Sequence, residues 1–388
     1  MKKKIAKILG LIIVFMAVGS FLYSRRYTEY EWNAQEAVDQ QEQLGVLDEY
    51  CFPKHYEREV SDKLRFDVEV DPGNFSGEEP YLTAQATRAS IDPEKVYDYF
   101  MSEKKDISPV VYENYSDQDG NSIPITVYAD DSCSLSVSTA DFFYTSETMS
   151  YIHNAFYPDT STAAYNGDLY SIDSNLNFMD RNAAWLQIYS AIEKTGLDME
   201  GAISRITYSL DLKTLKDEEL CIDVNGNICE EEKNVNWTEN DEGYYYYIAQ
   251  SWEGIPFYDS MYIDEDEITN ASLEIYQTGE GIEAAYLNQW FEIQPLQEEK
   301  RLADFEQIMK TVEEKYTGTI RTNPLVVEKA TLYLFTVETN TKGVYSLEPV
   351  WICTLAEDHV DLGENRYTSK FWVPIHAVTA EEMYVVET

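Results

Sequence analysis

The residue types that carry most enzyme chemistry are few and scattered in this chain. Its four histidines, His55, His153, His359 and His376, lie far apart in the sequence, and none stands in an HExxH motif or at another zinc-ligand spacing. The sequence also contains no GxSxG nucleophile elbow, no phosphate-binding loop and no dinucleotide-binding fingerprint. We therefore assign no catalytic, cofactor-binding or metal-binding residue, and we predict that the protein is not an enzyme.

Two short stretches match functional motifs in part. The stretch "SEKK" (102–105) has the SxxK spacing of penicillin-interacting serine enzymes, but so short a match is expected by chance, and no SDN or KTG partner accompanies it. The stretch "DVNGNICEEEKN" (223–234) begins like an EF-hand calcium loop. It then departs from that pattern, because Ile228 replaces the required glycine and Asn234 replaces the bidentate glutamate. We interpret it as a hairpin turn.

Acidic residues dominate the charge of the chain. There are 71 Asp and Glu against 29 Lys and Arg, which gives a formal net charge of −42. This balance argues strongly against nucleic acid as a partner, because phosphate binding needs clustered Lys and Arg. No carboxylate pair suited to glycosidase chemistry stands out among so many. We interpret the acids as solvated faces, with calcium binding or a basic peptide partner as the alternatives.

The N-terminus predicts a signal or anchor segment over residues 1–26. A lysine-rich start precedes an apolar run at 8–23, and two arginines follow it. We favour an uncleaved single-pass anchor, since the excess of lysine before the run places the rest of the chain outside the cytoplasm. The alternatives are cleavage after Ser20, which would give a secreted protein, and a buried N-terminal core helix. Residues 27–60 then form a juxtamembrane stalk.

The cysteines do not form a metal or redox motif. They number five and include no CxxC: Cys51, Cys133, Cys221, Cys229 and Cys353. A disulfide between Cys221 and Cys229 requires a three-residue hairpin loop, because a two-residue Asn225-Gly226 turn would place Cys229 opposite Ile222. The alternative is that these thiols are buried and free.

Three helices and many strands are expected between residue 61 and the C-terminus. The helices fall within 90–105, 177–197 and 301–318, with Asp92 before Pro93 as the first cap and Asp180 or Asn177 as the second. The remaining stretches alternate apolar and polar residues and are separated by turn signals. This order predicts an α+β fold of antiparallel sheets, each packed by one or two amphipathic helices, after the anchor helix. We expect two domains, at 61–218 and 240–388.

The last part of the chain, about 243–383, contains a set of residues whose order matches a known module: Gly254, Ile255, Pro256, Tyr345, Leu347, Pro349, Val350, Trp351, Pro374, Ile375, Ala377 and Thr379. On these residues it resembles the PepSY-like modules of extracytoplasmic Gram-positive proteins, which include membrane-anchored YycI/YycH-type regulators. Such modules usually end in D-A-x-T-G, but here His376 replaces the aspartate and Ala380 the glycine. We expect a different turn there, with Pro374 on an edge strand and His376 as a turn or edge residue.

The resemblance implies a membrane-anchored role in binding or inhibiting other proteins, without catalysis. We therefore expect an extracytoplasmic, non-enzymatic protein that binds or regulates an envelope protein. Two alternatives stay open: a secreted solute- or carbohydrate-binding protein, and an enzyme whose carboxylates come together only in the fold.

Overall fold

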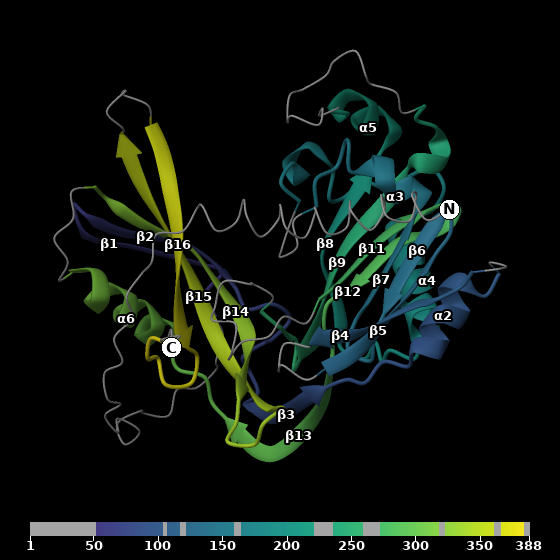
Figure 1. Cartoon of the computed structure of the whole chain (residues 1–388). Coiled ribbons are helices and arrows are strands. Elements are labelled where there is room, and N and C mark those ends of the chain that lie inside the picture. The colour runs from purple at the N-terminus through teal and green to yellow at the C-terminus, as the bar shows by residue number, and fades with distance from the viewer. Residues whose placement is uncertain are drawn as a thin grey trace. The chain divides into compact units, whose positions relative to one another are not determined.

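The computed structural model describes residues 52–103, 107–116, 122–158, 164–220, 236–258, 272–317, 323–360 and 366–383 (Figure 1). Within these residues the chain forms two sheets and a small number of helices, so the predicted α+β class is confirmed. No helix in the described ranges is long and apolar enough to cross a membrane. The predicted anchor at 8–23 and residues 27–51 of the predicted stalk lie outside them. The rest of the stalk prediction is wrong, because His55–Ser61 forms a strand of the fold.

The first sheet has seven strands. They are β1 (His55–Ser61), β2 (Leu64–Asp71), β3 (Tyr81–Arg88), β13 (Phe291–Lys300), β14 (Leu325–Glu338), β15 (Val344–Val360) and β16 (Arg366–His376). The order is β1-β2-β14-β15-β3-β13, and β16 pairs with the other part of β15. All pairs are antiparallel except β2 with β14. β16 pairs with no other named strand, so Pro374 lies on an edge strand as predicted.

The second sheet has nine strands and is wholly antiparallel. They are β4 (Val110–Ser116), β5 (Ser122–Ala129), β6 (Cys133–Val137), β7 (Phe142–Ser146), β8 (Ala202–Leu210), β9 (Gly243–Trp252), β10 (Ile255–Pro256), β11 (Ser272–Thr278) and β12 (Gly281–Leu287). The order is β10-β9-β11-β12-β7-β6-β5-β4, with β8 on the other side of β9. Strand β4 is therefore one edge of this sheet.

Within the described residues, five α-helices pack on the two sheets. Helix α6 (Phe305–Thr317) covers the seven-stranded sheet. Helices α2 (Pro93–Met101) and α4 (Arg181–Lys194) cover one face of the nine-stranded sheet. The short helices α3 (Glu147–Ile152) and α5 (Leu212–Glu218) contribute to a smaller, tyrosine-rich core on its other face.

The three expected helices form for the expected reasons. The Asp92 carboxylate caps α2 and accepts the Glu94 N–H, with Pro93 at the first helical position. The Asp180 carboxylate caps α4 and accepts the N–H groups of Asn182 and Ala183 in its first turn. In α6 every third or fourth residue is apolar and buried, which forms one stripe toward the sheet. The stripe consists of Phe305, Ile308, Met309, Val312 and Tyr316.

The division into domains at 61–218 and 240–388 is wrong as a description of the sheets. The seven-stranded sheet takes β1 from the predicted stalk, β2 and β3 from the first predicted domain and β13 to β16 from the second, and β4 to β12 form the second sheet between them. The chain crosses from one sheet to the other at two adjacent points, because Arg88 of β3 pairs with Phe291 of β13. The nine-stranded sheet is thus an insertion whose two ends meet. Alternation predicts which face of a strand is buried but not which strand it pairs with.

The turn between β9 and β10 fastens the insertion to the first sheet. The Asn74 N–H donates to the Gly254 carbonyl at 2.8 Å, and Gly254 has φ +79°. A Cβ on Gly254 would lie 2.8 Å from the backbone of Asn74. Gly254 is therefore required both by its left-handed backbone and by the close approach of the two chains.

We predict that Gly254→Ala lowers the free energy of unfolding by more than about 2 kcal/mol, because strain and a backbone clash add together. Gly343→Ala is the matched control. Gly343 also has positive φ (+75°), but its Cβ would meet nothing within 4 Å, so only the backbone cost of about 1 kcal/mol applies. Urea unfolding of both variants measures the difference, and equal losses would contradict the tight contact.

Candidate functional site

The structure keeps the four histidines apart, and no group of three or more His, Cys, Asp or Glu in the described ranges is arranged to hold a metal ion. His376 closes the turn after β16. Its Nδ1 accepts the N–H groups of Val378 and Thr379 at 3.2 Å, and its Nε2 lies 3.3 Å from the Glu348 carboxylate. The hydrogen bond from His376 lowers the pKa of Glu348. The interpretation of His376 as a turn residue is confirmed.

The residue that replaces the usual glycine also has a defined place in this turn. Ala380 has φ +58°, in the left-handed region that glycine favours. Its N–H donates to the His376 carbonyl at 2.9 Å. Ala380 thus adopts a backbone conformation that a glycine would adopt without the strain of a Cβ.

The other candidate residues of the sequence do not form a site. Ser102 is an exposed residue at the end of α2, and Lys105 lies outside the described residues. So do the EF-hand-like stretch 223–234 and three cysteines, Cys51, Cys221 and Cys229. Cys133 and Cys353 are buried, and burial raises the pKa of the Cys353 thiol to about 12. A thiol with that pKa is a packing group rather than a nucleophile.

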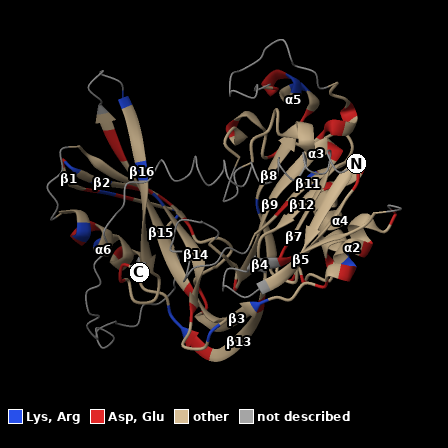
Figure 2. Cartoon of the chain, viewed as in Figure 1, with Lys and Arg blue, Asp and Glu red and all other residues tan. Residues whose placement is uncertain are grey.

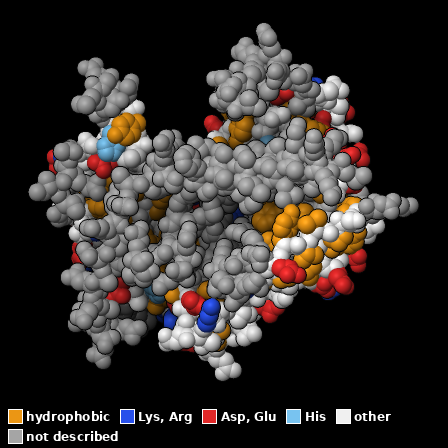
Figure 3. All heavy atoms as spheres, in the orientation of Figure 1, with side chains coloured by type: hydrophobic (Ala, Val, Ile, Leu, Met, Phe, Trp, Pro, Cys, Tyr) orange, Lys and Arg blue, Asp and Glu red, His pale blue; other side chains and the backbone are white. Residues whose placement is uncertain are grey.

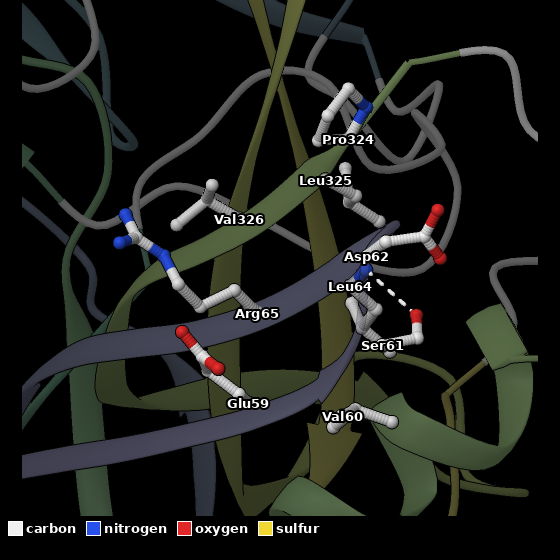
Figure 4. Close-up of a pocket in the computed structure, with 9 residues that line it drawn as sticks. All are labelled: Glu59, Val60, Ser61, Asp62, Leu64, Arg65, Pro324, Leu325 and Val326. Carbon is white, nitrogen blue, oxygen red and sulfur yellow. Dashed lines mark hydrogen bonds between the residues drawn. The ribbon is translucent and has the colours of Figure 1, made fainter.

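A cavity of about 540 Å³ lies where the β1–β2 turn meets the start of β14 (Figure 4). Its charged lining residues are Glu59, Asp62 and Arg65, and the Leu64 N–H beneath them donates to the Ser61 hydroxyl at 3.1 Å. Its lining, as far as the described residues form it, contains no aromatic side chain and so offers no stacking surface for a sugar. The cavity shows no convergent set of groups for catalysis.

One part of the nine-stranded sheet exposes an apolar face, which we call the open sheet face. It comprises Val110, Tyr112, Ile125, Val127, Phe143 and Tyr286. Val110, Tyr112 and Phe143 are 46%, 41% and 43% exposed, and the other three are half-buried. Figure 3 shows hydrophobic side chains on the visible surface near the place where Figure 1 draws β5 and β7. Such exposure of neighbouring large apolar residues is unusual for a surface without a binding role.

The register shows that these residues share one side of the sheet. Val110 pairs with Val127, which pairs with Ser136, and Ser136 pairs with Phe143. Phe143 then pairs with Tyr286, and their ring centroids lie 6.2 Å apart. Because directly paired residues point to the same side, this row runs across β4, β5, β6, β7 and β12.

The same strands are well covered on their opposite side. The side chain of Phe142 points to the opposite side of the sheet from that of Phe143. It is fully buried with Val137 and Leu287 under α2 and α4. On the open side, the helices α3 and α5 belong to a core centred on β8, β9 and β11. Helices α2 and α4 therefore cover most of one face, although Val111 at its β4 edge is still 54% exposed, and the described helices cover only part of the other face.

The open sheet face is surrounded by negative charge. Strands β4 to β7 contain no Lys or Arg, as Figure 2 also shows. The sequence from Asp106 to Asp180 has twelve Asp and Glu and no Lys or Arg at all. Among these, Glu113 at the end of the face, Asp131 in the β5–β6 turn and Glu147 at the start of α3 are exposed. The surface combines apolar area with an acidic border.

This face was not predicted from the sequence, although two signals for it were present. The gap in Lys and Arg between Asp106 and Asp180 marks the acidic border. Three consecutive apolar residues, Val110, Val111 and Tyr112, interrupt the alternation that a half-buried strand normally shows. Only the sheet order reveals that these residues lie at an edge.

Comparison with known proteins identifies the fold and no function. No family model matches the chain, and no curated protein matches it. A solved structure of an uncharacterized protein from Eubacterium rectale is similar, with a TM-score of 0.64 and 16% sequence identity. The match covers 86% of this chain and 94% of that one. At this identity the likeness shows a shared fold.

We predict that Phe143→Ala changes the free energy of unfolding by less than about 1 kcal/mol, whereas Phe142→Ala lowers it by about 3 to 5 kcal/mol. The two substitutions remove the same ring from opposite sides of β7, where Phe142 is fully buried and Phe143 is 43% exposed. Urea unfolding tests the pair. A large loss for Phe143→Ala would mean that this ring stabilises the fold and that the face is not open.

We also predict that acid destabilises the fold through His153, the residue that ends α3 beside this face. Burial lowers the pKa of His153 to about 4, from an ordinary value of 6.5. At a pH between these two values His153 is protonated in the unfolded chain but not in the folded one. The free energy of unfolding therefore falls by about 2 kcal/mol as the pH decreases from 7 to 4.5. His153→Gln should lose this part of the pH dependence, whereas the exposed control His55→Gln should keep it. Urea unfolding at both pH values measures it, and an unchanged slope for His153→Gln would contradict the assignment.

Proposed function

We propose that the chain is a membrane-anchored, extracytoplasmic protein without enzymatic activity that binds another envelope protein. The observation that carries this proposal is the open sheet face. When a partner covers exposed apolar side chains, the free energy of binding gains about 25 cal/mol for each Å² of apolar surface removed from water. The face is the exposed side of a sheet, whereas small ligands prefer concave pockets, which favours a macromolecule over a small ligand.

The N-terminal sequence supports the location. The lysine-rich start and the apolar run at 8–23 have the order of a signal or an anchor. The run is somewhat short for a span, but flanking lysine and arginine side chains reach toward the membrane surface and extend it. The acidic remainder of the chain is repelled by an anionic bilayer, so a protein partner suits the open sheet face better than lipid does.

The composition of the described sites supports a binding role over catalysis. His376 is used to close a turn, Cys353 is held as a neutral thiol, and the cavity beside β1 lacks convergent groups. A secreted sugar-binding protein is the weaker proposal, because none of the described residues that line that cavity is aromatic. Phe143 and Tyr112 offer exposed rings, but the other residues that define the open sheet face, Val110, Ile125, Val127 and Tyr286, are mostly apolar.

We predict that a photo-crosslinking amino acid at Phe143 captures one discrete protein in intact cells, because this side chain lies in the middle of the open sheet face. The same amino acid at Leu186 is the control. Leu186 is 68% exposed on α4, on the covered side of the same sheet. Crosslinked species are separated by gel electrophoresis and identified by mass spectrometry.

The expected result is a distinct adduct at position 143 that is absent at position 186. Identical patterns at the two positions would contradict a specific surface. Labelling of single cysteines with a membrane-impermeant maleimide in the same cells tests the location, and a chain protected along its whole length would contradict the extracytoplasmic part of the proposal.

A further inference from the structure

The edge strand β4 narrows the kind of partner that fits the open sheet face. We propose that the partner adds an extended strand to the free edge of β4, and that this strand alternates apolar residues with Lys or Arg. This inference rests on the proposed protein-binding function and states how that binding is made.

The position of β4 supplies the backbone groups. Within the described ranges β4 pairs only with β5, through Val110 with Val127, Val111 with Thr126 and Tyr112 with Ile125. An antiparallel strand with one neighbour directs about half of its N–H and C=O groups away from the sheet, where an added strand can bond with them. This mode of recognition uses the backbone for affinity and alternate side chains for specificity.

The side chains of β4 favour such an addition. Val110 and Tyr112 are exposed on the open side, and Val111 is 54% exposed on the other side. Natural edge strands are usually protected by lysine or proline within the strand, and the stretch Val110–Tyr112 has neither. A bulge between Tyr112 and Tyr115 ends the regular ladder, so the regular part of the edge is short. An added strand of a few residues is enough to cover it.

The charges around β4 specify the polar residues of the added strand. Glu113 follows the apolar stretch directly, and no Lys or Arg occurs anywhere in β4 to β7. A second copy of this chain would bring the same acidic edge, with a net charge of −42 on each molecule, so pairing of two copies is opposed by like charge. Lys or Arg at alternate positions of the partner strand is attracted by the negative charge around β4, while the apolar residues of that strand cover Val110 and Tyr112.

The test uses the full-length chain in a nonionic detergent and a defined probe, a fluorescein-labelled peptide of alternating Lys and Val. We expect its anisotropy to rise with the wild-type protein at about 20 mM NaCl and the affinity to fall at least about tenfold at about 300 mM, because salt screens the charge pairing. Tyr112→Lys should weaken binding by about tenfold or more. Leu186→Lys makes the same charge change on the covered side of the sheet and should alter binding less than about twofold. The matched Glu-Val peptide should not bind.

Hydrogen exchange separates strand addition from other modes of binding. Peptic peptides that contain Val110–Tyr112 should take up less deuterium when the Lys-Val peptide is bound, because an added strand bonds to the outward amides of β4. Circular dichroism and thermal unfolding of Tyr112→Lys check that the fold is kept. Because Tyr112 is 41% exposed, we expect both to match the wild type.

Equal binding by Tyr112→Lys and the wild type, or protection only outside β4, would overturn this proposal. Stronger binding of a helix-forming Leu-Lys peptide with β4 amides unprotected would also overturn it, as would a dimer in sedimentation that blocks the probe. In each of these cases a crosslink from position 143 in cells would still support protein binding by the face, so the two proposals fail separately.

Discussion

The junction where the chain passes between its two sheets is the constraint on which the fold depends. Arg88 pairs with Phe291, the Ala89 N–H donates to the Trp290 carbonyl at 2.8 Å, and so the departing and returning strands are held together. The buried Gln250 side chain fixes the same point from β9. Its Oε1 accepts the Phe291 N–H at 2.7 Å and its Nε2 donates to the Phe291 carbonyl at 2.8 Å. A buried amide with both ends bonded to one backbone residue is costly to separate, since each group would be left without a partner.

This junction explains how an insertion from Ala89 to Trp290 is accommodated. An insertion is tolerated where its two ends lie close together, because the host sheet then keeps its own pairing. The host strands β3 and β13 remain neighbours although the whole nine-stranded sheet separates them in the sequence. The β9–β10 turn adds a second contact through Gly254 and Asn74, and Phe257 forms a bridge with Leu334 of β14.

The sequence predicted the local elements better than their assembly. The caps Asp92 and Asp180 and the apolar stripe of α6 act over a few residues, so they can be recognised without the fold. The inserted sheet could not be recognised, because β3 and β13 pair across more than half of the chain. The same limit hid the candidate site. Val110 and Phe143 lie on strands that are separated in the sheet by β5 and β6. No local sequence pattern indicates that the face they share is not covered by a helix.

The open sheet face and the acidic border around it fit a protein that works by association. The insertion presents β4 as its outermost strand, far along the sheet from β9, whose turn is fastened to the host sheet. Most of the core of the insertion lies under α2 and α4, and a smaller core lies beside α3 and α5, so exposure of the open sheet face costs the fold little packing. That separation lets the surface at β4 to β7 serve a partner without weakening the junction.

The most direct test of the central claim compares the accessibility of position 143 in cells and in the purified protein. Phe143→Cys is made in a chain whose Cys51, Cys221 and Cys229 are replaced by serine, and it is labelled with a membrane-impermeant maleimide. The account predicts fast labelling of the purified protein and slow labelling in intact cells, with Leu186→Cys labelled fast in both. Equally fast labelling of position 143 in cells and in the purified protein would contradict a partner on the open sheet face.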